Sequence, residues 1–143
     1  KYIKQGISEG ATLICGGNEV NEEGFFIEPT IFTDVTAEMT IAREEIFGPV
    51  LCIEKFGNES LEEIANRANQ TTYGLSGSVW TSDISTGHKM AALIDSGQVS
   101  INCHAAVDSA IPFGGNKQSG WGREFGEEGL DSYLKTKATT VMY

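Results

Sequence analysis

Residues 50–103, VLCIEKFGNESLEEIANRANQTTYGLSGSVWTSDISTGHKMAALIDSGQVSINC, decide the fold. They contain three strand-like runs, residues 50–56, 76–81 and 98–103, separated by two segments with helical periodicity. The first helical segment begins with Ser60 and Glu63 at the spacing of a capping box, and Asp83 is the N-cap of the second. Strands that alternate with helices in this way call for right-handed parallel crossovers, so the sequence predicts an α/β fold with a parallel βαβαβ core.

The residues before this core predict smaller elements. A helix over residues 1–9 ends at Gly10, and strands follow over residues 11–15 and 25–32, with an acidic loop at 21–23 between them. Pro29 cannot donate a backbone hydrogen bond, so the second strand is predicted to lie at an edge or to contain a bulge. A short helix is predicted over residues 37–43.

The residues after the core change in character. Residues 104–129 contain six glycines without helical or strand periodicity, and a loop longer than about 12–15 residues in a compact domain is usually functional or disordered. We predict an ordered, functional loop, then a short helix near residues 130–134 and a β-branched tail strand, residues 136–143, that needs a partner. The domain division is therefore 1–135 and 136–143.

Composition excludes several classes of protein. The 143 residues are 40% hydrophobic, enough for a core, and 20 acidic against 10 basic side chains give a net charge of −10. This balance argues against nucleic acid or an anionic membrane as a partner. No apolar run reaches the roughly 20 residues of a membrane span, and no signal peptide is recognisable. We expect a cytoplasmic protein and, because the sequence begins with Lys1 inside a helix, a fragment of a longer one.

The three cysteines, Cys15, Cys52 and Cys103, are odd in number and never form a C-x-x-C pattern, so neither a disulfide framework nor a zinc site is indicated. Cys15 and Cys52 lie in predicted strands and are expected to be buried apolar side chains. Cys103 is next to His104, but adjacent residues at the end of a strand point in opposite directions.

Two motifs contain residue types that are suited to ligand binding or catalysis. Glu45 and Phe47 precede a strand, where a carboxylate can accept hydrogen bonds from two vicinal hydroxyls and a ring can pack on a flat heterocycle; alternatively they are a solvated glutamate and a core phenylalanine. The glycines between Phe113 and Gly126 let backbone approach a ligand closely, and Arg123 beside Glu124 offers an ion pair. A purely structural loop is the alternative, and neither G-x-G-x-x-G nor a P-loop is present.

These segments together resemble the C-terminal part of an NAD(P)-dependent aldehyde dehydrogenase. The resemblance covers nearly the whole chain in family order and rests on residues 25–31 (FFIEPTI), 41–50 (IAREEIFGPV), 68–75, 99–103 and 112–124 (PFGGNKQSGWGRE). Residues 102–104 with Asp108 and Ser119-Gly-Trp-Gly122 are similar to the phenylacetaldehyde or aromatic-aldehyde branch.

The resemblance implies roles by position for the cofactor, which is NAD or NADP. Glu45 matches the carboxylate that holds the nicotinamide ribose, Phe47 the ring near the nicotinamide, and Leu75 a backbone position near its carboxamide. Glu124 matches a glutamate proposed to relay protons to the general base.

The resemblance also implies roles toward substrate, cation and subunits. Val107, Ile111 and Phe113 match the loop that lines the aldehyde tunnel, and the carbonyls of Lys117 and Gly120 match an optional monovalent cation site. The tail strand pairs across subunits in the family, which implies a homo-oligomer.

The family's nucleophilic cysteine, general base, oxyanion asparagine and dinucleotide-binding segment would all lie upstream of Lys1. In the complete enzyme the thiolate attacks the aldehyde, hydride leaves for the nicotinamide, and water hydrolyses the thioester. The chain alone is therefore expected to be inactive. Two alternatives remain: a non-catalytic oligomerisation module that uses the tail strand, and an isolated nucleotide-binding domain.

Overall fold

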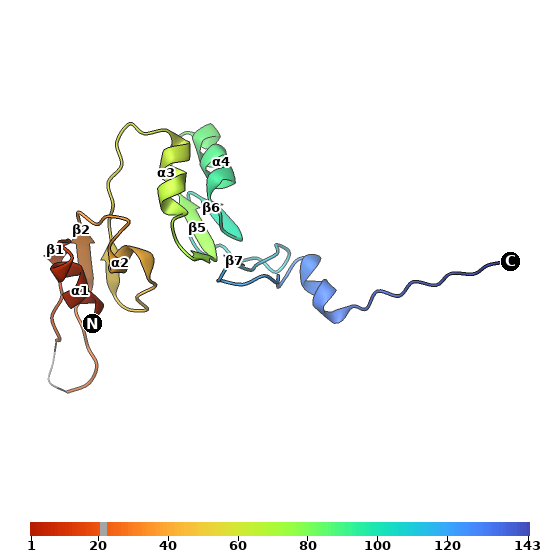
Figure 1. Ribbon diagram of the computed structural model, residues 1–143, viewed down its shortest axis with the longest axis horizontal. Helices are drawn as coiled ribbons and strands as arrows, with labels where there is room; N and C mark the ends of the chain where they lie inside the picture. The colour runs from red at the N-terminus through yellow and green to blue at the C-terminus, as the bar shows by residue number, and fades with distance from the viewer. Residues whose placement is uncertain (21–22) are drawn as a thin grey trace. The chain divides into compact units, whose positions relative to one another are not determined.

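Residues 1–20 and 23–143 are described by the structure, a computed structural model, and their contacts divide the chain into unit 1 (residues 1–71) and unit 2 (residues 72–143) (Figure 1). Of the acidic loop predicted at residues 21–23, residues 21 and 22 lie outside this description.

Unit 1 has a three-stranded sheet with three helices. Its elements in chain order are α1 (Tyr2–Ser8), β1 (Thr12–Cys15), β2 (Thr30–Thr33), α2 (Thr40–Arg43), β3 (Val50–Cys52) and α3 (Leu61–Ala68). The sheet has the order β1-β2-β3, with β1 antiparallel and β3 parallel to β2. Its core is a cluster of buried apolar side chains: Ala11, Phe32, Val35, Met39 and Ile41.

Unit 2 has one parallel crossover and one short antiparallel pair. Its elements are β4 (Tyr73–Gly74), β5 (Ser76–Val79), α4 (Ile84–Leu93), β6 (Gln98–Ile101), β7 (Asn116–Lys117) and the 3₁₀ helix η1 (Glu128–Tyr133). Strands β5 and β6 are parallel and are connected by α4, whereas β4 and β7 are antiparallel. The glycine-rich loop, residues 104–129, contains β7. The pairing of β7 with β4 therefore brings this loop beside the first strand of unit 2 (Figure 1).

Both predicted helix starts are confirmed. The Glu63 amide donates to Ser60 Oγ at 3.2 Å and the Ser60 amide donates to Glu63 Oε2 at 2.9 Å, which completes the capping box of α3. The Asp83 carboxylate accepts from the amides of Ser85 and Thr86 at 3.1 and 3.2 Å at the start of α4. Such capping depends on residues within one turn, which is why the sequence alone could predict it.

The predicted βαβαβ core is only partly correct. The run 98–103 pairs with 76–81 as predicted, but β3 pairs with β2, so in the described residues the strands flanking α3 belong to different sheets. The alternation of strands and helices indicates crossovers but does not say which strands become neighbours. The structure supports a mixed α/β fold.

Two predicted strands also differ from those observed. The predicted strand 25–32 becomes β2, which begins at Thr30 directly after Pro29 and is the middle strand of its sheet, so the predicted edge position is wrong. The irregularity in register lies in β1, between Leu13 and Cys15. The predicted tail strand is not formed: residues 134–143 have no regular structure.

Glu9 links the end of α1 to the start of α2. Its carboxylate accepts from the Thr40 hydroxyl at 2.6 Å, the Thr40 amide at 2.8 Å and the Gln5 side chain at 2.7 Å. These hydrogen bonds, that from the Thr40 hydroxyl first, hold the pKa of Glu9 below its ordinary value of 4.5. Glu9 therefore couples the stability of unit 1 to pH.

We expect Glu9→Gln to remove part of the acid sensitivity of unit 1. Because the folded-state pKa is depressed, the stabilisation by the Glu9 carboxylate is complete above the unfolded-state pKa and is lost as pH falls through the folded-state value. Urea midpoints of wild type and Glu9→Gln should therefore differ most at pH 6, and the difference should be smaller at pH 3. An equal difference at both pH values would contradict this role.

Candidate functional site

Glu45 and Phe47 are both exposed on the segment that joins α2 to β3. Ile46, between them, packs against the core cluster of unit 1. This burial orients the segment so that the carboxylate and the ring on either side of Ile46 face solvent. The alternative in which Phe47 is a core residue is wrong, because Phe47 is 88% exposed.

The segment is fixed at both ends. On the helix side, the Tyr2 hydroxyl donates to Glu44 Oε2 at 2.7 Å and the Glu44 amide donates to the Thr40 carbonyl at 3.0 Å. On the strand side, the Thr30 amide donates to the Pro49 carbonyl at 2.8 Å. Glu45 and Phe47 are therefore presented on backbone held by its neighbours.

Phe47 has a left-handed backbone conformation, with φ of +50°. This region disfavours residues with a side chain, and such strained positions cluster at binding and catalytic sites. An exposed aromatic ring at such a position can pack on a planar ligand, and the nearby carboxylate can accept from hydroxyl groups. A carboxylate and a ring placed in this way suit a sugar diol beside a flat ring, which stays a prediction from the sequence.

Leu75 connects β4 to β5 in unit 2 and is partly exposed. Its carbonyl accepts from the Gln98 amide at 3.2 Å, and the carbonyl of the preceding Gly74 accepts from the Gly97 amide at 3.0 Å. The Gly74 amide donates to Ser119 Oγ at 3.0 Å. The Leu75 backbone is thus held by the turn after α4 and by the glycine-rich loop.

The glycine-rich loop is ordered by backbone pairing between Phe113 and Glu124. Each amide donates to the carbonyl of the other residue at 2.7 Å, and the Glu124 side chain remains exposed. Among the proposed tunnel residues, Val107 and Ile111 are 53% and 52% exposed, whereas Phe113 is half-buried. Unit 2 therefore brings Phe113 and Glu124 together.

Arg123 does not pair with Glu124 as the sequence suggested. Among the described residues its guanidinium donates to the carbonyls of Gly115 at 2.8 Å and Gly122 at 2.9 Å and to Asn116 Oδ1 at 2.7 Å. The carbonyls lie within hydrogen-bond reach of a fork-shaped donor, while the Glu124 side chain points to solvent. Arg123 therefore stabilises the conformation of the glycine-rich loop.

The cation site predicted from Lys117 and Gly120 depends on backbone carbonyls. Both residues have positive φ, +52° and +141°. In the part of the chain that the structure describes, no three His, Cys, Asp or Glu side chains form a group that could hold a metal ion. The monovalent cation site at the two backbone carbonyls stays a prediction from the sequence.

The cysteines differ from expectation in one case. Cys15 is exposed, not buried, because the side chains of β1 are all exposed. Cys52 donates to the Ile41 carbonyl at 3.4 Å, and burial raises the pKa of its thiol. A raised pKa is the opposite of what activates a nucleophilic thiolate.

Sequence reasoning missed a contact between Ser78 and His104. Ser78 Oγ lies 2.8 Å from His104 Nδ1, and both residues are exposed. Parallel pairing places Ser78 opposite Ser100, shortly before His104, so a register assigned to the predicted strands could have found this contact.

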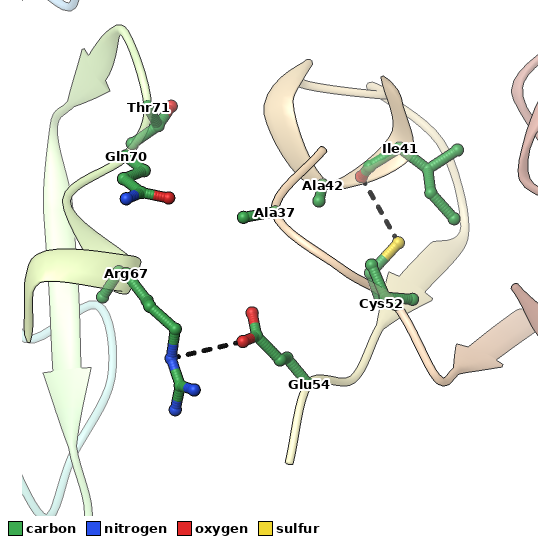
Figure 2. A pocket seen from close by; sticks show the side chains of 10 residues that line it. Ala37, Ile41, Ala42, Cys52, Glu54, Arg67, Gln70 and Thr71 are labelled. Carbon is green, nitrogen blue, oxygen red and sulfur yellow. Dashed lines mark hydrogen bonds and ion pairs between the residues drawn. The ribbon is translucent and has the colours of Figure 1, made fainter. Parts of the chain in front are cut away.

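A cavity of about 290 Å³ lies in unit 1 (Figure 2). Two polar contacts are seen in its wall: Arg67 Nε lies 3.3 Å from Glu54 Oε1, and Cys52 Sγ contacts the Ile41 carbonyl (Figure 2). The lining residues are Val35, Ala37, Ile41, Ala42, Cys52, Glu54, Arg67, Ala68, Gln70 and Thr71. The cavity contains neither Glu45 nor Phe47, so it is separate from the residues assigned to the cofactor.

Within the described residues, every helix is too short or too polar to cross a bilayer.

Comparisons with known proteins identify the family of this chain. The model of the aldehyde dehydrogenase family matches residues 1–139. The cytosolic 10-formyltetrahydrofolate dehydrogenase of Xenopus tropicalis is 50% identical over 143 residues, and the mitochondrial 10-formyltetrahydrofolate dehydrogenase of Homo sapiens is 48% identical over the same length. In both cases the match covers 100% of this chain and 16% of the relative, so the chain spans about a sixth of their length.

A solved structure gives the same result. A mutant of an indole-3-acetaldehyde dehydrogenase from P. syringae, in complex with NAD⁺ and IAA, matches with a TM-score of 0.90 and 43% sequence identity. The match covers 96% of this chain and 28% of that chain. The chain described here belongs to the aldehyde dehydrogenase family.

Proposed function

We propose that this chain forms part of the cofactor and aldehyde sites of a dehydrogenase that oxidises a hydrophobic or aromatic aldehyde to a carboxylic acid with NAD⁺ or NADP⁺. The observation that supports this most is the exposed pair Glu45 and Phe47, held outward by the packed Ile46 and by the strained Phe47 backbone. NAD(P)⁺, when bound, supplies the hydride acceptor. We propose the cytoplasm as the compartment, because its reducing environment is compatible with three free thiols.

On this proposal each cofactor-binding residue has a defined task. The Glu45 carboxylate accepts hydrogen bonds from both hydroxyls of the nicotinamide ribose, and the Phe47 ring excludes water from one side of the nicotinamide. The Leu75 backbone, held between Gln98 and the turn after α4, lies against the carboxamide. None of these residues takes part in bond making.

The remaining residues act on the substrate side. The exposed apolar side chains of Val107 and Ile111, with Phe113, line the path of the aldehyde and favour an apolar substrate. The exposed Glu124 carboxylate relays a proton toward the general base. The carbonyls of Lys117 and Gly120 bind an optional monovalent cation.

We propose that the thiol nucleophile comes from another part of the complete protein. The raised pKa of Cys52 argues against that residue, and Cys15 lies in β1 beside the Pro29 carbonyl. The family resemblance assigns neither of them, nor Cys103, to the nucleophile position. The 143-residue chain alone is therefore expected to produce no NADH from aldehyde and NAD⁺.

In the complete dehydrogenase we expect Glu45→Gln to raise the KM for NAD⁺ roughly tenfold or more, because a hydrogen bond to a charged group contributes about 1.5–3 kcal/mol. The KM for the aldehyde should change much less. Initial rates with each substrate varied in turn give both values.

The control is Glu62→Gln, which removes the same charge from an exposed position on α3. It should leave both KM values unchanged. Equal effects of the two substitutions would show that net charge is responsible and would contradict the assignment of Glu45.

A second candidate function is subunit assembly through the tail. Its side chains are among the most exposed apolar groups of the described chain: Val141 is 64% and Met142 94% exposed. Extended chain with exposed apolar residues is suited to pairing with a sheet edge of another subunit.

Deletion of residues 136–143 is therefore expected to lower the oligomeric state of the protein. Size-exclusion chromatography with light scattering measures the mass of both forms. A strict monomer with and without these residues would contradict assembly through the tail and would leave the dehydrogenase proposal unaffected.

A further inference from the structure

Unit 2 is built around backbone and polar contacts. Its buried positions, within the residues that the structure describes, are Gly74, Gly87 and Gly115. The large buried side chains of the core all belong to unit 1. The position of the glycine-rich loop therefore depends on hydrogen bonds, and a polar side chain at a junction of segments can set the geometry of the site.

Asp95 occupies such a junction in the turn between α4 and β6. Its Oδ1 accepts from Asn116 Nδ2 at 3.1 Å, and its Oδ2 lies 3.4 Å from Lys117 Nζ. Both partners belong to β7, so a single carboxylate ties the turn to that strand. Asn116 is itself oriented by Arg123, which donates to its Oδ1 at 2.7 Å.

The same turn also holds the backbone that precedes Leu75. The Gly97 amide donates to the Gly74 carbonyl at 3.0 Å, and the Gln98 amide donates to the Leu75 carbonyl at 3.2 Å. The Asp95 carbonyl lies so close to Gly74 that a Cβ added there would be 2.7 Å from it. The Asp95 backbone therefore packs directly against the residue before Leu75.

β7 completes the arrangement from the other side. Gly74 pairs with Asn116 in the β4–β7 ladder, and the Gly74 amide donates to Ser119 Oγ. The Gly74–Leu75 segment thus contacts both the turn at residues 95–97 and β7. The Asp95 side chain connects the turn to β7.

We propose that Asp95 is a positioning residue for cofactor binding: by joining the turn at residues 95–97 to β7, it sets the backbone of Leu75 against the nicotinamide carboxamide. This inference rests on the proposed function of Leu75. Asp95 itself does not touch the cofactor. Its acceptor role toward Asn116 is essential, whereas its charge is not, because the Asp95 carboxylate is half-exposed and an ion pair with an exposed partner contributes little.

The test compares Asp95→Ala with Asp95→Asn in the complete dehydrogenase. Asparagine keeps an oxygen that can accept from Asn116 Nδ2, and alanine does not. We expect Asp95→Ala to raise the KM for NAD⁺ about fivefold or more with kcat within about twofold, since the loss concerns binding geometry. Asp95→Asn should restore the KM to within about twofold of wild type.

Hydrogen exchange gives an independent readout. The peptide that contains Gly74 and Leu75 should exchange faster in Asp95→Ala than in wild type or Asp95→Asn, because β7 is then no longer held to the turn and Ser119, the partner of the Gly74 amide, follows shortly after β7. A KM for NAD⁺ unchanged in Asp95→Ala, or equally raised in both variants, would overturn the inference, as would unchanged exchange of this peptide. If the complete wild-type protein does not bind NAD⁺, the proposed function itself fails, and the role of Asp95 toward the cofactor fails with it.

Discussion

Phe32→Ala is expected to destabilise unit 1 by about 3–5 kcal/mol, the usual cost of removing a fully buried phenylalanine. Phe32 is 0% exposed, lies in the middle strand β2 and belongs to the core cluster of unit 1. Domains of this size have total stabilities of only about 5–15 kcal/mol, so the variant should be close to unfolding at 25 °C. Hydrogen exchange of the peptide containing residues 30–33 measures the loss.

Phe56→Ala is the matched control, because Phe56 is 63% exposed and lies outside the core cluster. This substitution should change stability by no more than about 0.5 kcal/mol. If Phe32→Ala and Phe56→Ala had equal effects, the core cluster would not be the source of the stability of unit 1.

Gly97→Ala is expected to destabilise unit 2 by about 3 kcal/mol or more, since overpacking that cannot be relieved by a side-chain rotation displaces backbone. A Cβ on Gly97 would collide with the Gly114 carbonyl oxygen and approach Gly115 Cα to 3.3 Å. The Gly97 amide would then separate from the Gly74 carbonyl. Both tryptophans, Trp80 and Trp121, lie in unit 2, so fluorescence in a urea titration reports on this unit.

Gly122→Ala separates the steric effect from the general effect of replacing glycine. No atom lies within 4 Å of a Cβ at Gly122, and neither Gly122 nor Gly97 has a positive φ. Gly122→Ala should therefore leave the fluorescence midpoint nearly unchanged. A similar loss in both variants would contradict the close approach of the turn to the glycine-rich loop.

Local features of the fold were predictable from sequence, and strand pairing was not. The caps formed by Ser60 and Asp83 depend on hydrogen bonds within one helical turn, so the residue types alone identify them. The pairing of β3 with β2 depends on contacts far apart in sequence, and alternation of strands and helices does not specify it. The predicted run 50–56 likewise ends at Cys52.

In the candidate site, too, local patterns could be predicted from the sequence and the contacts of the folded chain could not. From the spacing of Glu45 and Phe47, a site for a sugar diol and a flat ring is one of two alternatives, whereas the positive φ of Phe47 and the inward packing of Ile46 could be seen only in the structure. Arg123 was predicted to pair with its neighbour Glu124, yet it binds carbonyls that the turn of the loop brings to it. Which residues of a folded loop contact each other cannot be inferred from their being neighbours in the sequence.

A crystal structure of the complete protein with NAD⁺ bound tests the cofactor assignment most directly. We expect the Glu45 carboxylate to lie within hydrogen-bond distance of both nicotinamide ribose hydroxyls and the Phe47 ring to pack beside the nicotinamide. A nicotinamide riboside bound elsewhere, with Glu45 and Phe47 still exposed to solvent, would contradict the assignment of this chain to the cofactor site.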